Sequence, residues 1–129
     1  MKSKFYYSDW TTSSKRDYYK VLHRVDGPAV EYSDGTKSWI INGKLHREDG
    51  PAIEHSSGTK EWYKEDRIHR ENDLPAFEGA NGYKAWYKEG QRHRLIGPAV
   101  IYPNCLDVEY WIESKNYSKQ QFDNIISNM

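Results

Sequence analysis

The chain has 129 residues and very little of three things: cysteine, long hydrophobic runs and net charge. Its single cysteine, Cys105, excludes an internal disulfide and favours a reducing compartment. No apolar run approaches the length of a membrane span or of a secretory signal, so we expect a soluble cytoplasmic protein. Because 19 basic side chains balance 19 acidic ones, no overall field draws the protein to polyanions or to anionic lipid.

Aromatic side chains, in contrast, are abundant. Eleven Tyr and five Trp occur in a chain whose hydrophobic content is only 36%. Such a low content would by itself indicate disorder, but each aromatic ring buries a large area and can hold a thin sheet together. The composition therefore predicts a folded protein that relies on aromatic packing.

One motif recurs four times: His-Arg, a short acidic or turn stretch, Pro-Ala, an apolar residue, a turn and then Trp. The histidines of the copies are spaced 23, 23 and 24 residues apart, and the tryptophans 23, 24 and 25. A period of this length is typical of stacked repeats, in which one unit cannot bury its apolar face alone. The recurring residues are His23, His46, His69 and His93, each followed by Arg24, Arg47, Arg70 or Arg94, then Pro28, Pro51, Pro75 and Pro98, and Trp39, Trp62, Trp86 and Trp111.

Each copy predicts two strands. The first begins at the Pro-Ala step, as in residues 29–32, where the missing proline N–H does little harm to a strand ladder. A turn with glycine leads to a second strand that carries the Trp, as in residues 37–41. Asn42-Gly43 is then the strongest short signal for a further hairpin turn. The predicted fold is all-β: an antiparallel β-hairpin repeat array, a twisted meander of about four repeats of 23–25 residues, with a short C-terminal α-helix.

The two ends differ from the repeats, as capping segments of repeat arrays do. We expect residues 1–22 to form a degenerate aromatic capping hairpin, residues 23–117 the four repeats, and residues 118–129 a capping helix, all in one structural domain. Ser118 and Gln121 form a capping-box pattern ahead of apolar residues at helical spacing. The helix should pack its apolar stripe over the last hairpin.

The repeat resembles a known class. Its HREDGPA core and the hairpins at 33–44 and 54–64, of the type DGTKxWYxNGK, are similar to the MORN-variant repeats of tailed phages, giant viruses and some bacteria. Residues 116–122 also resemble the way such arrays end, and the similarity covers residues 21–126. It implies a twisted β-hairpin array for binding or assembly, without common catalytic residues, and with phage accessory or counter-defence roles among its settings.

Two copies depart from this pattern. The third copy contains an inserted residue within 72–75, and the fourth lacks the turn glycine, with 103–106 in its place. We expect a bulge or an added specificity at these two departures.

The recurring His-Arg pairs have two interpretations. Their guanidinium groups could hold a phosphate or carboxylate ligand. Alternatively, nearby acids neutralise each Arg, and the pairs hold the repeats together. Recurrence in every copy favours the second interpretation, because a ligand site usually needs only one or two copies, and the Trp set is similarly interpreted as core. The candidate ligand-binding residues are His46, Arg47, His69, Arg70, His93, Arg94, Trp62, Tyr63, Trp86 and Tyr87.

The sequence assigns no catalytic residue, metal or cofactor. Histidines of neighbouring repeats would lie roughly 9–10 Å apart across two strands, too far to share a zinc ion. His55 has no Cys or His at ligand spacing, and the serines cluster in turns. No glycine-rich phosphate loop precedes a helix, and Cys105 lies in the divergent fourth turn.

Nucleic acid is the strongest rival to a protein as partner. Lys60, Lys64, Lys84 and Lys88 share the Trp face by strand parity and could hold phosphates beside stacked bases. However, residues 23–117 contain 13 basic against 16 acidic side chains, which weakens binding driven by counterion release. The basic excess lies in residues 1–22, with five basic against two acidic side chains.

We therefore expect a non-enzymatic interaction module, phage- or virus-encoded by resemblance, that binds and sequesters or inhibits a host protein. The first alternative is capture of a small phosphorylated or nucleotide signalling ligand by the His-Arg pairs. The second is single-stranded nucleic-acid binding. Exposed sheet edges also predict a homo-oligomer.

Overall fold

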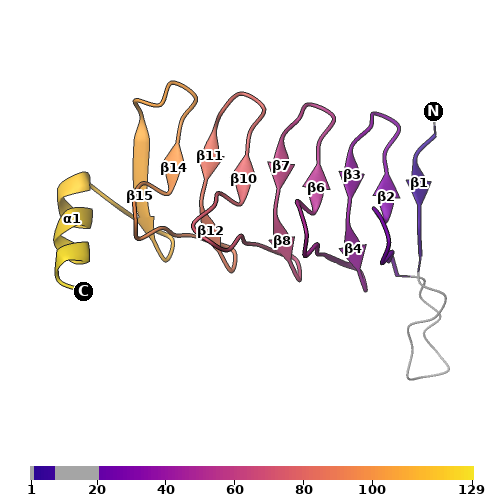
Figure 1. Ribbon diagram of the computed structural model, residues 1–129, viewed down its shortest axis with the longest axis horizontal. Helices are drawn as coiled ribbons and strands as arrows, with labels where there is room; N and C mark the ends of the chain where they lie inside the picture. Colours follow the sequence, from indigo (N-terminus) through magenta and orange to yellow (C-terminus); the bar gives the residue numbers. More distant parts are fainter. Residues whose placement is uncertain (1, 8–20) are drawn as a thin grey trace. The chain divides into compact units, whose positions relative to one another are not determined.

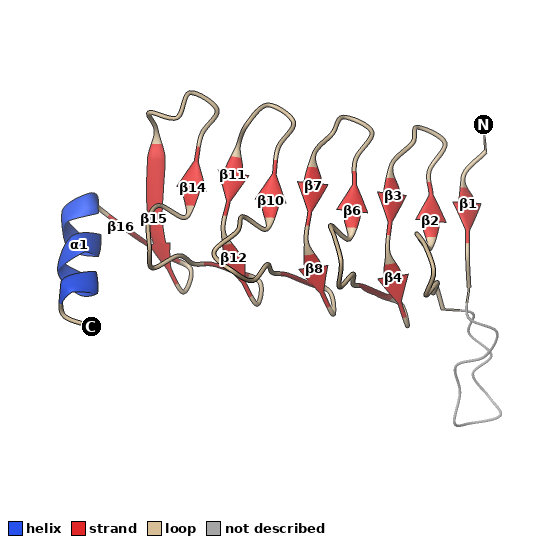
Figure 2. Cartoon of the chain, in the orientation of Figure 1, coloured by secondary structure: helices blue, strands red, loops and turns tan. Residues whose placement is uncertain are grey.

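The computed structural model describes residues 2–7 and 21–129, which form 16 short strands and one helix (Figures 1 and 2). Two compact units are present, Met1–Arg67 and Ile68–Met129. The predicted capping hairpin of residues 1–22 lies largely outside the described residues. Its described part contributes a first strand and an antiparallel bridge between Tyr7 and Leu22.

The first unit is an antiparallel meander with a small hairpin attached. Its main ladder has the strand order β1-β2-β3-β6-β7, while β4 and β5 pair separately. Ser38 lies opposite both Val30 and Ile53, which fixes the register of the central strands. The strands are β1 (Lys4–Phe5), β2 (Val30–Glu31), β3 (Lys37–Ser38), β4 (Ile40–Ile41), β5 (Lys44–Leu45), β6 (Ile53–Glu54), β7 (Lys60–Glu61) and β8 (Tyr63–Lys64), and β9 (Arg67–Ile68) contains the division between the units.

The second unit repeats this plan. Its ladder has the order β10-β11-β14-β15-β16, with a separate hairpin of β12 and β13. Ala85 lies opposite both Phe77 and Val100, as Ser38 does in the first unit. The elements are β10 (Phe77–Glu78), β11 (Lys84–Ala85), β12 (Tyr87–Lys88), β13 (Gln91–Arg92), β14 (Val100–Ile101), β15 (Val108–Ile112), β16 (Lys115–Tyr117) and α1 (Lys119–Ser127).

The predicted hairpin meander is confirmed, but the strands are shorter and more numerous than the two per repeat expected. The predicted second strand divides at its Trp: β3 ends before Trp39 and β4 begins after it. The Trp39 N–H donates to the carbonyl of Ala52 and its own carbonyl accepts from His46, so the chain changes hydrogen-bonding partner at this residue. Trp86 does the same with Ala99 and His93. Only β15, at the last repeat of the described chain, runs unbroken through its Trp.

Small side chains form the centre of each unit. The alanine of every Pro-Ala step is fully buried, with 0% exposure at Ala29, Ala52, Ala76 and Ala99. Trp86 is buried as well, whereas Trp39, Trp62 and Trp111 are half-buried. The thin sheet therefore uses alanine at its most enclosed positions, while Trp39, Trp62 and Trp86 lie between successive short strands and Trp111 lies within β15.

The small hairpins turn through pairs of left-handed residues. Asn42 and Gly43 have φ values of 50° and 79°, which confirms the predicted turn, and such pairs suit the twist of a two-residue hairpin. The second N–H of each turn donates to a carbonyl earlier in the chain, as from Gly43 to Leu22 and from Asp66 to Leu45 of β5. The equivalent pairs are Glu65–Asp66, Glu89–Gly90 and Glu113–Ser114.

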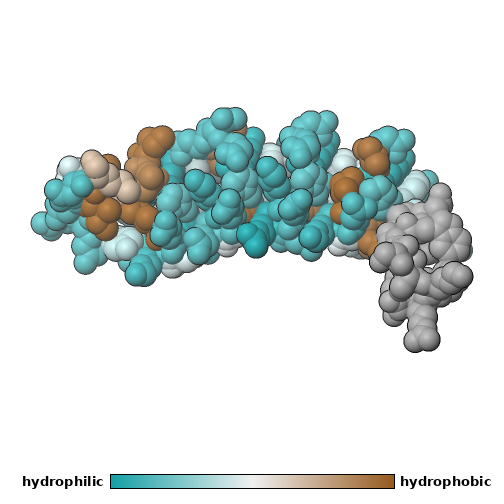
Figure 3. All heavy atoms as spheres, turned by 90° about the horizontal axis from the view of Figure 1, so that it is seen from below, coloured by the Kyte–Doolittle hydropathy of each residue, from teal (hydrophilic) through white to brown (hydrophobic). Residues whose placement is uncertain are grey.

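The C-terminal helix α1 begins as predicted. Ser118 accepts a hydrogen bond from the Gln121 N–H, and the Gln121 side chain accepts one from the Ser118 N–H, which completes a capping box. Phe122 is buried against Tyr110 of β15, with ring centroids 4.8 Å apart. Hydrophobic atoms accordingly gather around α1 in Figure 3. The described residues contain no helix with the length and apolar character of a membrane span.

Candidate functional site

The arginine of each His-Arg pair folds back onto its own loop. Its Nη1 donates to the carbonyl of the proline that follows, at 3.0–3.2 Å in all four repeats. Arg24 also stacks over the ring of Tyr6, Arg47 over Trp39 and Arg94 over Trp86. The distances from the guanidinium carbon to the ring centroid are 4.0, 3.8 and 3.9 Å, which are cation–π contacts.

Carboxylates neutralise these arginines. The Arg47 Nε lies 3.1 Å from Asp49, and its Nη1 lies 3.3 Å from Glu54. Equivalent ion pairs join Arg24 to Asp26 and Arg70 to Glu78. The loop glycine leaves room for this arrangement, because a Cβ added at Gly50 would lie 2.9 Å from the Arg47 guanidinium carbon. The same holds at Gly27, where a Cβ would lie 3.0 Å from Arg24.

The histidines hold the hairpin turns. Each Nδ1 accepts a hydrogen bond from the N–H of the first left-handed turn residue, at 2.9–3.1 Å in all four repeats. In the second repeat this joins His46 to Glu65. Because Nδ1 is an acceptor, Nε2 carries the proton and donates to Glu48 at 2.7 Å, so this imidazole is neutral. His69 donates to Glu71 in the same way.

The structure places the predicted ligand-binding residues in separate repeats and engages them locally. The loops ahead of β6, β10 and β14 carry the three His-Arg pairs, and Trp62 and Trp86 lie between paired strands. Of the candidates, Arg94 and Trp86 are brought together. The backbone also joins two of the pairs to the tyrosines, since the Arg47 N–H donates to the Tyr63 carbonyl and the Arg70 N–H to the Tyr87 carbonyl, both at 3.4 Å. The tyrosine hydroxyls have strand neighbours: that of Tyr63 donates to Glu61, and that of Tyr87 accepts from Arg92.

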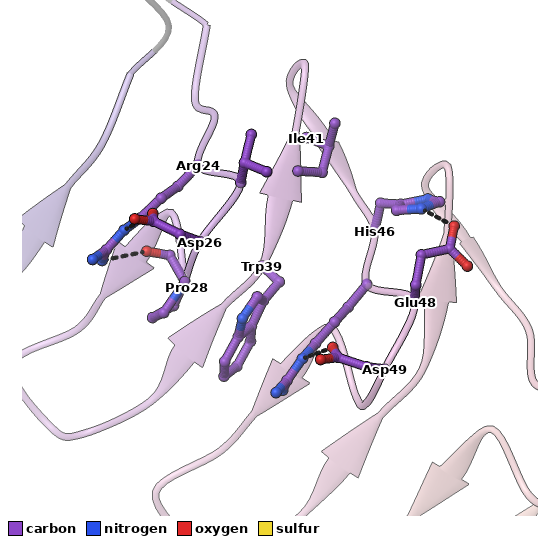
Figure 4. Close-up of a pocket in the computed structure, with 11 residues that line it drawn as sticks. Arg24, Asp26, Pro28, Trp39, Ile41, His46, Glu48 and Asp49 are labelled. Atoms are coloured by element: carbon purple, nitrogen blue, oxygen red, sulfur yellow. Dashed lines mark hydrogen bonds and ion pairs between the residues drawn. The ribbon is translucent and has the colours of Figure 1, made fainter.

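A groove opens between two His-Arg loops of the first unit (Figure 4). Its walls are the loops 24–28 and 46–49, and Trp39 and Ile41 lie between them. Its volume is about 800 Å³. We call this space the Trp39 groove. Sequence reasoning placed Trp39 in the structural set only and did not predict the groove.

The rim of the Trp39 groove is acidic and partly apolar. The side chains of Asp26 and Asp49 are each 87% exposed, that of Glu48 is 78% exposed, and the apolar Val25 is 81% exposed. Three carboxylates thus face the two arginines that line the groove, while His46 is neutral. The lining therefore carries a net charge of about −1.

Trp39 adds a free donor to this groove. Its indole N–H has no acceptor among residues 2–7 and 21–129, whereas that of Trp86 donates to the Asp73 carbonyl and that of Trp111 to Glu109. Figure 4 shows the indole nitrogen on the edge of the ring that faces the loop of Arg24 and Pro28. A ligand in the groove could accept this hydrogen bond.

The corresponding position of the second unit is filled. The longer third loop bends through left-handed Asn72 and Asp73, and the Asp73 carboxylate accepts from Arg94 Nε and Nη2 at 2.9 and 3.0 Å. The Asp73 carbonyl accepts the Trp86 indole N–H at 3.0 Å, and Trp86 is only 7% exposed. Residues 72–75, where a bulge was expected, therefore cover Trp86. We call this segment the plug.

This plug also replaces a missing acid. The fourth loop has Leu95 and Ile96 where the second has Glu48 and Asp49, so Arg94 has no acid in its own loop and takes Asp73 from the loop before. The insertion and the missing acid are one coupled change. In the sequence, the only indication of this coupling is that the inserted residue and the missing acid occur in consecutive copies of the repeat.

Charges alternate across the strands. Lys37 lies opposite Glu31 and Glu54, and Lys60 lies opposite Glu54 as well. Lys84 similarly lies opposite Glu78. These three lysines thus have acidic neighbours, whereas Lys88 lies opposite Gln91. The acidic neighbours lower the positive potential that nucleic acid would need.

Two carboxyl groups have lowered pKa values for local reasons. The Tyr102 hydroxyl donates to Glu109 and thereby lowers the pKa of that carboxyl, to which the Trp111 indole donates as well. The pKa of Asp34 is lowered by hydrogen bonds from the N–H and side chain of Thr36, a residue of the same turn. Both groups stabilise strand connections and lie outside the Trp39 groove.

The described part of the chain has no cluster of three or more His, Cys, Asp or Glu side chains that could hold a metal ion. Cys105 is exposed in a turn with a φ of 60°. Comparison with protein-family models, curated proteins and solved structures finds no match to this chain, so the site is interpreted from its own geometry.

Proposed function

We propose that the chain is a non-enzymatic repeat module that binds a partner protein, with the Trp39 groove as its binding site. The observation that carries this proposal is the contrast between equivalent positions. The Trp39 groove is open and its indole N–H has no acceptor in the described part of the chain, whereas Asp73 closes the position over Trp86. A half-buried tryptophan beside arginine is typical of the residues that dominate protein interfaces.

The resemblance of the repeats to those of tailed phages and giant viruses suggests the kind of partner. We propose a host protein that the chain sequesters or inhibits in the cytoplasm of the infected cell, in a counter-defence setting. A homo-oligomer remains part of this proposal, because strand edges and a repeated surface favour self-association.

The geometry favours this role over the two alternatives. Capture of a phosphorylated ligand needs guanidinium groups that can turn toward a phosphate, but the four arginines are engaged by proline carbonyls and by carboxylates. Single-stranded nucleic acid needs a positive surface, whereas Lys37, Lys60 and Lys84 of the main ladders lie opposite glutamates.

Native mass spectrometry of the tagged chain, purified from its host cytosol without a denaturing step, tests this function. We expect a host protein bound in a fixed molar ratio to the chain or to a defined oligomer of it. A stoichiometric nucleotide instead, or a chain that carries no protein at all, would contradict the proposal.

A further inference from the structure

We infer that the Trp39 groove receives an extended segment of the partner protein in which a Lys or Arg side chain lies next to an apolar one. This inference rests on the proposed function and specifies the partner's chemistry. Its basis is the plug in the second unit, which shows how a stretch of chain occupies the equivalent position.

The plug supplies the geometry of the backbone. At Trp86 the acceptor for the indole N–H is a main-chain carbonyl, that of Asp73, at 3.0 Å. The indole N–H of Trp39 has no such acceptor in the part of the chain that the structure describes. A main-chain carbonyl of a bound segment would complete the same hydrogen bond, and a space of about 800 Å³ holds several residues in extended form.

The two positions differ in the acids that surround their arginines, and this difference selects the side chain. Arg94 has no acid in its own loop, so the plug brings a carboxylate to it. Arg47 already has Asp49 and Glu54, so a second incoming carboxylate would meet an arginine that is already neutralised and three exposed acids. An incoming Lys or Arg instead reaches the exposed carboxylates of Asp26 and Asp49.

The apolar part of the segment has a matching surface. Val25 is 81% exposed on one wall, and Ile41 and the half-buried Trp39 ring lie within the groove. Covering these atoms removes apolar surface from water, which supplies affinity that the charges alone would not. An apolar side chain next to the cationic one would contact this surface, as the aliphatic part of a Lys or Arg stem also could.

A selection from a displayed library of random decapeptides against the full chain tests the inference. We expect the enriched peptides to carry Lys or Arg beside an apolar residue. Their affinity should fall about fivefold to tenfold in Trp39→Phe, which keeps a ring but lacks the donor, and at least as much in Asp26→Asn combined with Asp49→Asn. Asp123→Asn, which removes an exposed carboxylate of α1, is the matched control and should bind as the unchanged chain does.

A loop graft provides the sharpest variant. Replacing residues 25–28 by Glu-Asn-Asp-Leu-Pro, the sequence of 71–75, should build the plug over Trp39 and abolish peptide binding while the thermal midpoint stays near its original value. If the graft does not fold, the Trp39→Phe comparison decides. Enrichment of acidic peptides, no enrichment at all, or equal affinity in the Trp39→Phe chain would overturn the inference.

The same variants separate this inference from the proposed function. A partner protein that copurifies with the unchanged chain and equally with the Trp39→Phe chain and the graft would leave the proposed function standing and refute the Trp39 groove as its site. Absence of any bound protein in the unchanged chain would refute the proposed function itself.

Discussion

At the scale of single residues, the His-Arg pair links three local structures. The arginine closes its loop onto a proline carbonyl and covers an aromatic ring, while the histidine accepts the N–H of a left-handed turn residue. The arginine Nη1 and the histidine Nδ1 thus have partners in every repeat, as half-buried polar groups require. The pair recurs because each repeat has the same loop and turn to hold.

Removal of one histidine tests this account. We expect His46→Ala to lower the free energy of unfolding by about 1 kcal/mol, because the Glu65 N–H loses its acceptor. Urea denaturation measures the change. Lys119→Ala removes an exposed ion pair with Asp123 and serves as control, with no measurable change expected. Equal midpoints for the unchanged and His46→Ala chains would contradict the role of the imidazole.

Acid should weaken the fourth repeat through Glu109. The pKa of Glu109 is lowered by the hydrogen bond from Tyr102. The contribution of this carboxylate to the free energy of unfolding is therefore complete above its usual pKa of 4.5, and it is lost as the pH falls through the lower pKa of the folded chain. Tyr102→Phe removes that bond, so its free energy of unfolding should fall less than that of the unchanged chain between pH 7 and about pH 3. Urea titrations at the two pH values measure the free energy of unfolding of the Tyr102→Phe chain and of the unchanged chain.

Tyr32→Phe is the matched control for this pH effect. Tyr32 occupies the equivalent position in the first repeat, and its hydroxyl meets no carboxylate within residues 2–7 and 21–129. This variant should keep the full acid dependence of the unchanged chain. Identical pH dependence of Tyr102→Phe and Tyr32→Phe would rule out the assigned cause.

At the scale of elements, the hairpin turns show which parts of the fold could be read from sequence. Asn42-Gly43 was predicted as a turn, because glycine adopts positive φ readily. The capping box of α1 was predicted as well, since both of its residues are local in sequence. The division of a strand at Trp39 was not, because it depends on a change of hydrogen-bonding partner between distant segments.

The candidate site was less predictable than the fold. The His-Arg pairs stand out in the sequence, but whether their charges face solvent depends on contacts with carbonyls and rings that no spacing reveals. The coupling of Asp73 to Arg94 spans 21 residues, and neither loop shows it alone. The Trp39 groove is defined by the absence of such a plug in the first unit, which only the comparison of the two units reveals.

A glycine in place of Ser114 should make the last hairpin turn more stable. Ser114 has a φ of 66° at the position that Gly90 occupies with 84° in the preceding hairpin. Ser114→Gly should raise the free energy of unfolding by about 0.5–1 kcal/mol by removing left-handed strain. The reverse change, Gly90→Ser, should lower it by a similar amount, because an added Cβ meets open space and only the backbone opposes it. Urea midpoints that move in the opposite directions would contradict this explanation.

An acid in the fourth loop should be able to replace the Asp73 carboxylate as the partner of Arg94. Asp73→Asn should lower the free energy of unfolding by about 1–2 kcal/mol, because Arg94 loses its only acid partner among the described residues. Ile96→Asp restores an acid at the position of Asp26 and Asp49, so it should recover part of that loss in the Asp73→Asn chain and add little to the unchanged chain. A double-mutant cycle by urea denaturation measures the coupling, and additive effects would contradict it.

At the scale of the whole molecule, recurrence separates scaffold from site. What appears in all four copies, the Arg-to-proline bond and the His-to-turn bond, is internal to the fold. What differs between copies, the plug over Trp86 and the open Trp39 groove, is where the repeats become specific. A chain with no net charge and alternating strand charges then favours a protein as partner over a polyanion.

The most direct test of this separation is the double variant Arg47→Ala with Arg70→Ala, measured for urea unfolding and for calorimetric binding of ATP and cyclic AMP. We predict a loss of about 2 kcal/mol of unfolding free energy per arginine and no nucleotide binding by the unchanged chain, with the exposed Arg67→Ala as an unaffected control. A double variant as stable as the unchanged chain that has lost a nucleotide which the unchanged chain binds would show that the His-Arg pairs are the site.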